Sequence, residues 1–156
     1  PKELHLYAVR RLADQLVIAG EQGLLLRSRD NGKNFTRVAT PYPGSLFTVE
    51  LPDEQTIVVA GLRGNVLRSI DSGSSWTTMP TPMPVSVTAS ALDPDGQVVV
   101  TNQAGFVLSL RNNQWVRMND SPLPPLNGLL LLDRSSFLVA SVQGLLAARA
   151  ASGVSK

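Results

Sequence analysis

The stretch RSIDSGSSW, Arg68 to Trp76, follows an apolar run and joins a small polar turn to an aromatic residue. The stretch RSRDNGKNF, Arg27 to Phe35, stands 41 residues earlier and follows the same plan. Both have the pattern Arg-Ser-x-Asp-x-Gly-x-x-aromatic, so the pattern is either a chemical site or a repeated part of the scaffold. The spacing of other landmarks along the chain favours a repeated scaffold.

A period of about forty residues organises the whole chain, which is typical of a repeat architecture. Glycines that follow short apolar runs stand 41, 41 and 39 residues apart, at Gly23, Gly64, Gly105 and Gly144. Pairs of prolines keep the same period, at positions 41 and 43, 82 and 84, and 122 and 124. Each unit therefore contains the same succession of apolar runs, turns and a proline-rich linker.

The repeating unit contains four short segments with the composition of β-strands, and the last unit is the exception. In the second unit these are SLFTVEL, TIVVAG, NVLRSI and SWTTM, separated by turns rich in Asp, Gly and Ser. Four short antiparallel strands in about forty residues form the blade of a β-propeller. The sequence therefore predicts an all-β fold, a β-propeller of four-stranded antiparallel blades. About four blades are expected in this chain, at residues 1–40, 41–81, 82–121 and 122–156.

The two ends of such an arc of blades pose a packing problem. The strands TIVVAG and QVVVT are apolar on both faces, as a strand between two neighbouring blades requires. An arc of four blades exposes one apolar face at each end, and such faces drive association. We therefore expect either a part of a larger propeller or a homodimer that joins exposed blade faces. Residues 2–10 belong either to the first unit or to the last, which lacks an aromatic fourth strand.

Composition excludes several classes of function. The net charge of +2 comes from 14 basic and 12 acidic residues without a basic run, so no nucleic-acid partner is expected. The chain has no cysteine and one histidine, His5, which excludes thiolate metal sites and His-based triads within one chain. No apolar run approaches the roughly 18 residues of a membrane span. The sequence predicts no metal, no cofactor and no membrane-spanning segment.

The repeated octapeptide S-x-D-x-G-x-x-W/F resembles the Asp-box of bacterial neuraminidase (BNR) repeats. Its residues are Ser28, Asp30, Gly32 and Phe35 in the first copy, and Ser69, Asp71, Gly73 and Trp76 in the second. With the preceding Gly61, Gly64, Leu67 and Arg68, the second copy is similar to the repeat of the photosystem II stability/assembly factor family. The third unit keeps only the aromatic, Trp115, and the fourth unit has neither turn nor aromatic.

The physical chemistry of the motif favours a structural role. A short carboxylate accepts hydrogen bonds from N–H groups of its own turn, and glycine adopts a positive φ at low cost. A carboxylate engaged in this way is a poor general base. No Tyr and Glu stand in the arrangement that a sialidase needs, so no catalytic residue is predicted. The alternative is a sialidase-like glycoside hydrolase or glycan-binding module whose catalytic residues lie outside this sequence.

Binding to a protein is the remaining function. We expect the Gly-flanked turns and proline linkers on one face of the propeller, and the acidic turns and Asp-boxes on the other. Candidate binding residues are Gln22, Tyr42, Arg63, Gln103 and Gln143, together with the recurring Arg27 and Arg68. The family resemblance implies a non-enzymatic assembly factor that binds a membrane-protein complex. It also implies export, with a periplasmic location.

Overall fold

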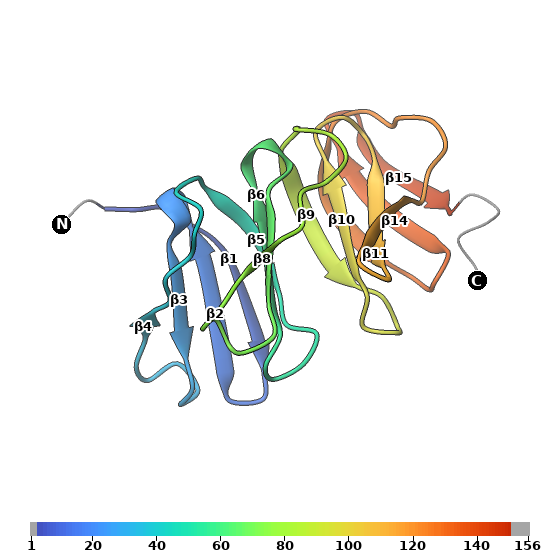
Figure 1. Cartoon of the computed structure of the whole chain (residues 1–156). Helices are drawn as coiled ribbons and strands as arrows, with labels where there is room; N and C mark the ends of the chain where they lie inside the picture. The colour runs from blue at the N-terminus through green and yellow to red at the C-terminus, as the bar shows by residue number, and fades with distance from the viewer. Residues whose placement is uncertain (1–2, 151–156) are drawn as a thin grey trace.

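The structure, a computed structural model, describes residues 3–150, and its regular secondary structure is almost wholly antiparallel β-sheet joined by turns and loops (Figure 1). The first sheet contains β1 (Leu6–Leu12), β2 (Gln15–Gly20), β3 (Leu25–Ser28) and β4 (Thr36–Arg37). The second contains β5 (Leu46–Glu50), β6 (Ile57–Gly61), β7 (Val66–Ser69) and β8 (Thr77–Thr78). The third contains β9 (Val87–Leu92), β10 (Val98–Asn102), β11 (Val107–Arg111) and β12 (Gln114–Arg117). The fourth contains β13 (Leu126–Leu131), β14 (Ser136–Ser141) and β15 (Gly144–Arg149).

Each sheet is a meander whose strands pair in chain order, which confirms the predicted all-β propeller of antiparallel blades. Helical structure in residues 3–150 is limited to two 3-10 turns, η1 (Glu21–Gly23) and η2 (Leu62–Gly64). Neither turn has the length or the apolar character that crossing a bilayer requires. The outermost strands β4 and β8 have only two residues each, because the Asp-box turn takes up the preceding segment.

The four blades form an open arc. Their first strands lie side by side in the order β1, β5, β9, β13, and no comparable contact joins β13 to β1 within residues 3–150. Figure 1 shows the blades following one another from the blue end to the red end. β1 pairs with β2, so Leu6–Leu12 belongs to the first blade, and the fourth blade has three described strands.

Three apolar clusters hold the arc together, one at each junction between neighbouring blades. The central strand β6 contributes to two of them: Val59 packs toward the first blade and Val58 toward the third. Both side chains are buried, as the two-sided apolar character of TIVVAG requires. Because β6 and β10 are each shared in this way, the outer faces of the first and fourth blades are the ones without a neighbouring blade within residues 3–150.

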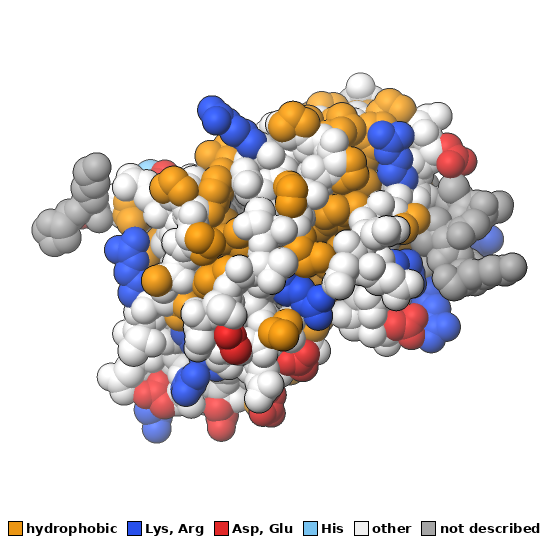
Figure 2. Space-filling view, viewed as in Figure 1, with side chains coloured by type: hydrophobic (Ala, Val, Ile, Leu, Met, Phe, Trp, Pro, Cys, Tyr) orange, Lys and Arg blue, Asp and Glu red, His pale blue; other side chains and the backbone are white. Residues whose placement is uncertain are grey.

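The loops separate onto two ends of the blades. The Gly23 N–H donates to the Gly44 carbonyl, which joins the turn after β2 to the following proline linker. At the opposite end the Asn31 N–H of the first Asp-box donates to the Asp14 carbonyl of the turn between β1 and β2. Figure 2 shows acidic side chains along the lower edge of the first blades, where Figure 1 places the Asp-box turns. The separation of the two loop sets follows the sequence prediction.

Candidate binding cleft between the second and third blades

The second Asp-box is a turn closed by its own side chains. The Ser69 hydroxyl donates to the Asp71 carboxylate over 2.7 Å and accepts the Gly73 N–H, also over 2.7 Å. The carboxylate accepts the Ser75 hydroxyl at 2.6 Å and the Ser75 N–H at 2.8 Å. Hydrogen bonds from Ser75, first its hydroxyl and then its N–H, lower the pKa of Asp71 to about 2. The carboxylate is ionised and fully engaged within the turn.

The first Asp-box repeats this arrangement with an amide in place of a hydroxyl. Ser28 donates to Asp30 over 2.7 Å, and the Asn34 side chain donates to the other carboxylate oxygen over 2.7 Å. The side chain and N–H of Asn34 lower the pKa of Asp30 to about 2. Gly32 has a φ of +86°, which favours glycine. Neither Asp-box offers a carboxylate free for proton transfer.

The aromatic residues of the second and third blades connect each blade to the one before it. The Trp76 indole N–H donates to the Ala39 carbonyl over 2.9 Å, and the Trp115 indole N–H donates to the Met79 carbonyl, also over 2.9 Å. Phe35 holds the same position in the first blade, has no N–H and is 40% exposed. Sequence reasoning missed these hydrogen bonds, although the choice of Trp or Phe was a signal of them.

At the junction of the first and second blades, the Asp-box turn covers an arginine. Arg27 is 8% exposed, and its Nε donates to the Gln15 side chain over 2.6 Å. Its Nη1 donates over 2.9 Å to the carbonyl of Ser72, which lies in the Asp-box turn of the second blade. Burial lowers the pKa of Arg27. This arginine therefore ties two blades together, and little of its side chain is exposed to solvent.

At the junction of the second and third blades, the equivalent arginine is open to solvent on one side. Arg68 pairs with Thr77 on the next strand, as Arg27 pairs with Thr36. The third blade has no Asp-box, and Asn112 and Asn113 alone connect β11 to β12. Arg68 donates to the Asn113 side chain over 3.1 Å, and it forms no salt bridge within the described part of the chain.

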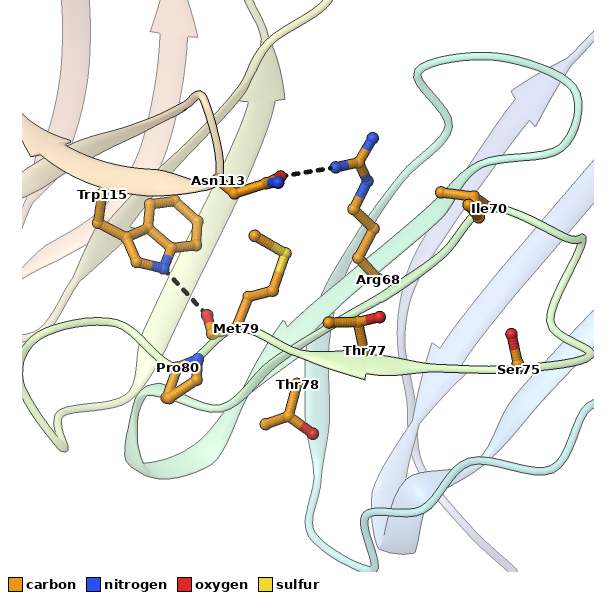
Figure 3. Close-up of a pocket in the computed structure, with 9 residues that line it drawn as sticks. All are labelled: Arg68, Ile70, Ser75, Thr77, Thr78, Met79, Pro80, Asn113 and Trp115. Carbon is orange, nitrogen blue, oxygen red and sulfur yellow. Dashed lines mark hydrogen bonds between the residues drawn. The ribbon is translucent and has the colours of Figure 1, made fainter.

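A cleft of about 580 Å³ lies where the longer turn would have been (Figure 3). Its lining residues are Arg68, Ile70, Ser75, Thr77, Thr78, Met79, Pro80, Asn113 and Trp115. Arg68 is the one charged residue among them, and the walls are largely apolar. In Figure 3 the Met79 side chain extends between the Trp115 ring and the Arg68 guanidinium. The arrangement suits an apolar group beside a carboxylate, since guanidinium forms strong charge-assisted hydrogen bonds.

A second, more polar hollow of about 420 Å³ adjoins the cleft and shares Arg68 and Asn113 with it. The two carboxylates in this hollow already have partners. Asp53 accepts the hydroxyl and N–H of Thr56, both at 2.7 Å, and Asp95 forms a salt bridge with Arg134. Arg68 is therefore the charged group of this region that has no salt-bridge partner within residues 3–150.

The other predicted binding residues lie away from the cleft. Gln22, Arg63, Gln103 and Gln143 are exposed at the turns between the second and third strands of successive blades. Tyr42 lies in the linker and donates its hydroxyl to the Leu62 carbonyl over 3.1 Å. Of the predicted set, the structure brings Arg68 alone into the cleft.

No group of His, Cys, Asp and Glu within residues 3–150 has the arrangement of a metal site. The cleft residues Met79, Pro80 and Ile70 were not predicted, because their meeting with Trp115 depends on the short turn of another blade.

Comparison with known proteins supports the fold. No family model matches the chain, and no curated protein matches its sequence. The WD40 propeller domain of Doa1 superposes with a TM-score of 0.77 over 91% of this chain and 49% of its own, at 11% identity. The fold is that of a β-propeller. YCF48 bound to D1 peptide superposes with a TM-score of 0.65 over 94% of this chain and 53% of its own, at 15% identity.

Enzymes also have this fold. An ancestral GH74 enzyme superposes with a TM-score of 0.70 over 92% of this chain and 22% of its own, at 16% identity. The chain spans about half the length of the YCF48 chain and a smaller part of the GH74 enzyme. At these identities the likeness concerns the fold alone, because unrelated functions share propellers.

Proposed function

We propose that this chain is a non-enzymatic protein-binding scaffold that holds an extended segment of a partner in the cleft beside Arg68. The observation that carries the proposal is the contrast between two equivalent arginines. Arg27 is buried under an Asp-box turn, whereas Arg68 faces an apolar cleft with donors to spare. The segment we expect carries an aspartate or glutamate next to a leucine-like side chain.

The chemistry of the cleft sets the strength of such a contact. Burying one leucine-sized side chain against Met79 and Trp115 contributes about 1.5 to 3 kcal/mol. A hydrogen bond between charged groups contributes about 1.5 to 3 kcal/mol more, and ordering the segment offsets part of both. The cleft by itself therefore gives weak, reversible binding, which suits a factor that holds a partner temporarily.

More specifically, we propose that the protein is an assembly or stability factor for a membrane-protein complex and acts in the periplasm. Its support is the resemblance of the Asp-box repeats to the photosystem II stability/assembly factor family. The solved YCF48 structure adds support, because a protein of this fold is bound there to a D1 peptide. Fractionation of cells that express the full-length protein tests the location. Co-purification of a membrane complex that is lost with Arg68→Glu tests the role.

A peptide titration tests binding in the cleft. The background is Trp76→Phe, which leaves Trp115 as the one tryptophan of the chain and places it in the cleft wall. The probe is the amidated, acetylated peptide GSLDLGS, with GSLNLGS as its neutral match. We expect GSLDLGS to change Trp115 fluorescence and to bind at least several-fold more tightly than GSLNLGS.

Arg68→Gln removes the charge and should abolish the difference between the two peptides. The matched control is Arg63→Gln, since Arg63 is exposed at a turn outside the cleft. Equal binding of both peptides, or a preference that survives Arg68→Gln, contradicts the proposal. A response of Trp115 to sialyllactose in place of the peptide contradicts it in favour of a glycan-binding module.

A further inference from the structure

The outer strand of the second blade, β8, has backbone groups that point away from its sheet. Thr78 lies opposite Leu67, and beside this pair the Met79 N–H donates to the Val66 carbonyl over 2.8 Å. Hydrogen-bonded and non-hydrogen-bonded pairs alternate along antiparallel strands, so the N–H and C=O of Thr78 face away from β7. Neither group has a hydrogen-bond partner within residues 3–150. Thr78 therefore forms an open edge of the second sheet.

This open edge borders the cleft beside Arg68 (Figure 3). Side chains alternate between the two faces of a strand, so Thr77 and Met79 share the face of Arg68, which is turned toward the third blade. Thr78 points to the opposite face, and both threonines of β8 are exposed. The cleft therefore has a charge, an apolar wall and, along one side, a free backbone N–H and C=O.

The outer strands of the first and third blades lack this combination. In the first blade, Arg37 holds the position of Thr78, but Arg27 of that blade is buried under the Asp-box turn of the second blade. In the third blade, the residue at the register of the arginine is Ser109, which is fully buried. β8 therefore combines an open edge with an uncovered arginine at this register, which β4 and β12 do not.

We propose that the partner segment binds as an added antiparallel strand at the edge of β8. The residue of the segment opposite Thr78 donates its N–H to the Thr78 carbonyl and accepts the Thr78 N–H, as in other cases of strand addition. Antiparallel addition continues the pairing of the blade, whereas Pro80, which has no N–H, keeps the added strand short. The inference rests on the proposed function, because the segment is the same one, and adds how its backbone is held.

The register of the added strand determines the order of its side chains. The residues on either side of the central one lie opposite Met79 and Thr77 and point into the cleft. The residue opposite Met79 contacts Met79 and Trp115, which suits leucine. The residue opposite Thr77 lies two strand spacings, about 10 Å, from Arg68, a distance that an arginine and an aspartate side chain span together. In an antiparallel strand the leucine comes first, so the segment reads Leu-x-Asp.

Two peptides of the same composition test this order. They are acetylated, amidated GSLSDSG and GSDSLSG, titrated against the Trp76→Phe protein with Trp115 fluorescence as the signal. The first peptide places its leucine beside Met79 and its aspartate beside Arg68, so it should bind at least several-fold more tightly. In GSLDLGS the leucines and the aspartate would lie on opposite faces of the strand, so that peptide uses the charge alone. Equal affinities, or a preference for GSDSLSG, would contradict the antiparallel strand.

Methylation of single backbone nitrogens in GSLSDSG tests the main-chain pairing. N-methylation of the central serine removes the N–H that donates to Thr78, so binding should weaken by at least about fivefold, the effect of one hydrogen bond. The matched control is N-methylation of the aspartate, whose N–H points away from β8 and whose loss should have little effect. Equal losses in the two methylated peptides, or no loss in either, would show that the segment does not pair with this edge.

A variant of the protein tests the other half of the pairing. Thr78→Pro removes the N–H that faces outward, and an edge strand tolerates proline where its N–H faces solvent. Arg37→Pro, at the same position of the first blade, is the matched control. We expect Thr78→Pro to lose binding of GSLSDSG and Arg37→Pro to keep it. Thr78→Ala should also keep it, because the Thr78 side chain points away from the cleft.

The outcomes separate this inference from the proposed function. Binding that prefers aspartate to asparagine and depends on Arg68, but is indifferent to the methylated positions, would support the proposed function and overturn the added strand. Failure of both GSLSDSG and GSLDLGS to bind would overturn both proposals. Circular dichroism establishes that each variant is folded, and the methylated peptides remain decisive even if Thr78→Pro fails to fold, since they are tested on the protein without it.

Discussion

Two junctions of the same molecule have an arginine at the same register, but one arginine is buried and the other lines an open cleft. Between the first and second blades, the seven-residue turn at 70–76 reaches over Arg27 and accepts one of its hydrogen bonds. Between the second and third blades, the hairpin at Asn112 and Asn113 is too short to reach Arg68 in this way, and a cleft takes the place of the turn. Where a repeat lacks the Asp-box, an open cleft takes the place of the covering turn.

The comparison teaches that the absence of an Asp-box is more informative about function than its presence. Where the motif is intact, its Ser and Asp are consumed by their own turn and its backbone covers the neighbouring blade. Where it is missing, the half-buried Arg68 and Trp115 side chains line an open cleft together. Variants at the covered junction and at the open junction should therefore have different, measurable effects.

The largest expected effect is on stability, from removal of the buried arginine. Arg27→Ala leaves the Gln15 side chain and the Ser72 carbonyl without their donor at a covered position, so we expect a loss of about 2 to 3 kcal/mol. Arg68→Ala should change the free energy of unfolding by less than about 0.5 kcal/mol. Urea unfolding of both variants measures the difference. Equal losses would show that the two arginines are structurally equivalent after all.

A smaller effect is expected from filling space under the Asp-box turn. Gly73 has a φ of +90°, and a Cβ there would lie 2.5 Å from Cγ1 of Val38 in the preceding blade. Gly96 has a φ of +76°, and a Cβ added there would have no atom within 4 Å. Gly96→Ala should cost about 1 kcal/mol from backbone strain alone, and Gly73→Ala about 1 kcal/mol more. If thermal unfolding gave the same midpoint for both variants, the turn would not pack on the first blade.

The smallest expected effect is on the loss of stability at acidic pH. The folded-state pKa of Asp71 is lowered from 3.8 to about 2 by Ser75, so its contribution to stability is complete above pH 3.8. That contribution is lost as the pH falls through 2, since the unfolded state then binds the proton more readily. Asp71→Asn should therefore flatten the fall of the urea midpoint across this range. Asp30→Asn, at the other Asp-box, is expected to behave alike, and an unchanged slope in either variant would contradict the assigned hydrogen bonds.

The period of the sequence predicted much of this fold, because local chemistry determines it. Gly23 and Gly64 stand where the turn after the second strand needs a positive φ and meets the following linker closely. The Asp-box turns are also local, since Ser69 and Asp71 contact partners within four residues.

The environment of each arginine could not be predicted in the same way. Arg27 and Arg68 occur in the same tripeptide, LRS, and their different exposure is decided by a turn about 45 residues further on, in the next blade. The bond from Trp76 to Ala39 likewise crosses between blades and has no local signature beyond the residue type. The short LRNNQW turn, which makes the difference, is visible in the sequence. Its effect on Arg68 depends on how the third blade packs on the second, which the sequence does not show.

Grafting the missing turn tests the central claim most directly. Residues 110–114 are replaced by SIDSGSS, the sequence of residues 69–75, in the Trp76→Phe background, so that Trp115 is kept. The account predicts a folded protein in which Arg68 is protected from phenylglyoxal, as judged by peptide mass, and Trp115 no longer responds to GSLDLGS. A folded graft whose Arg68 reacts freely and which binds the peptide as before would contradict it.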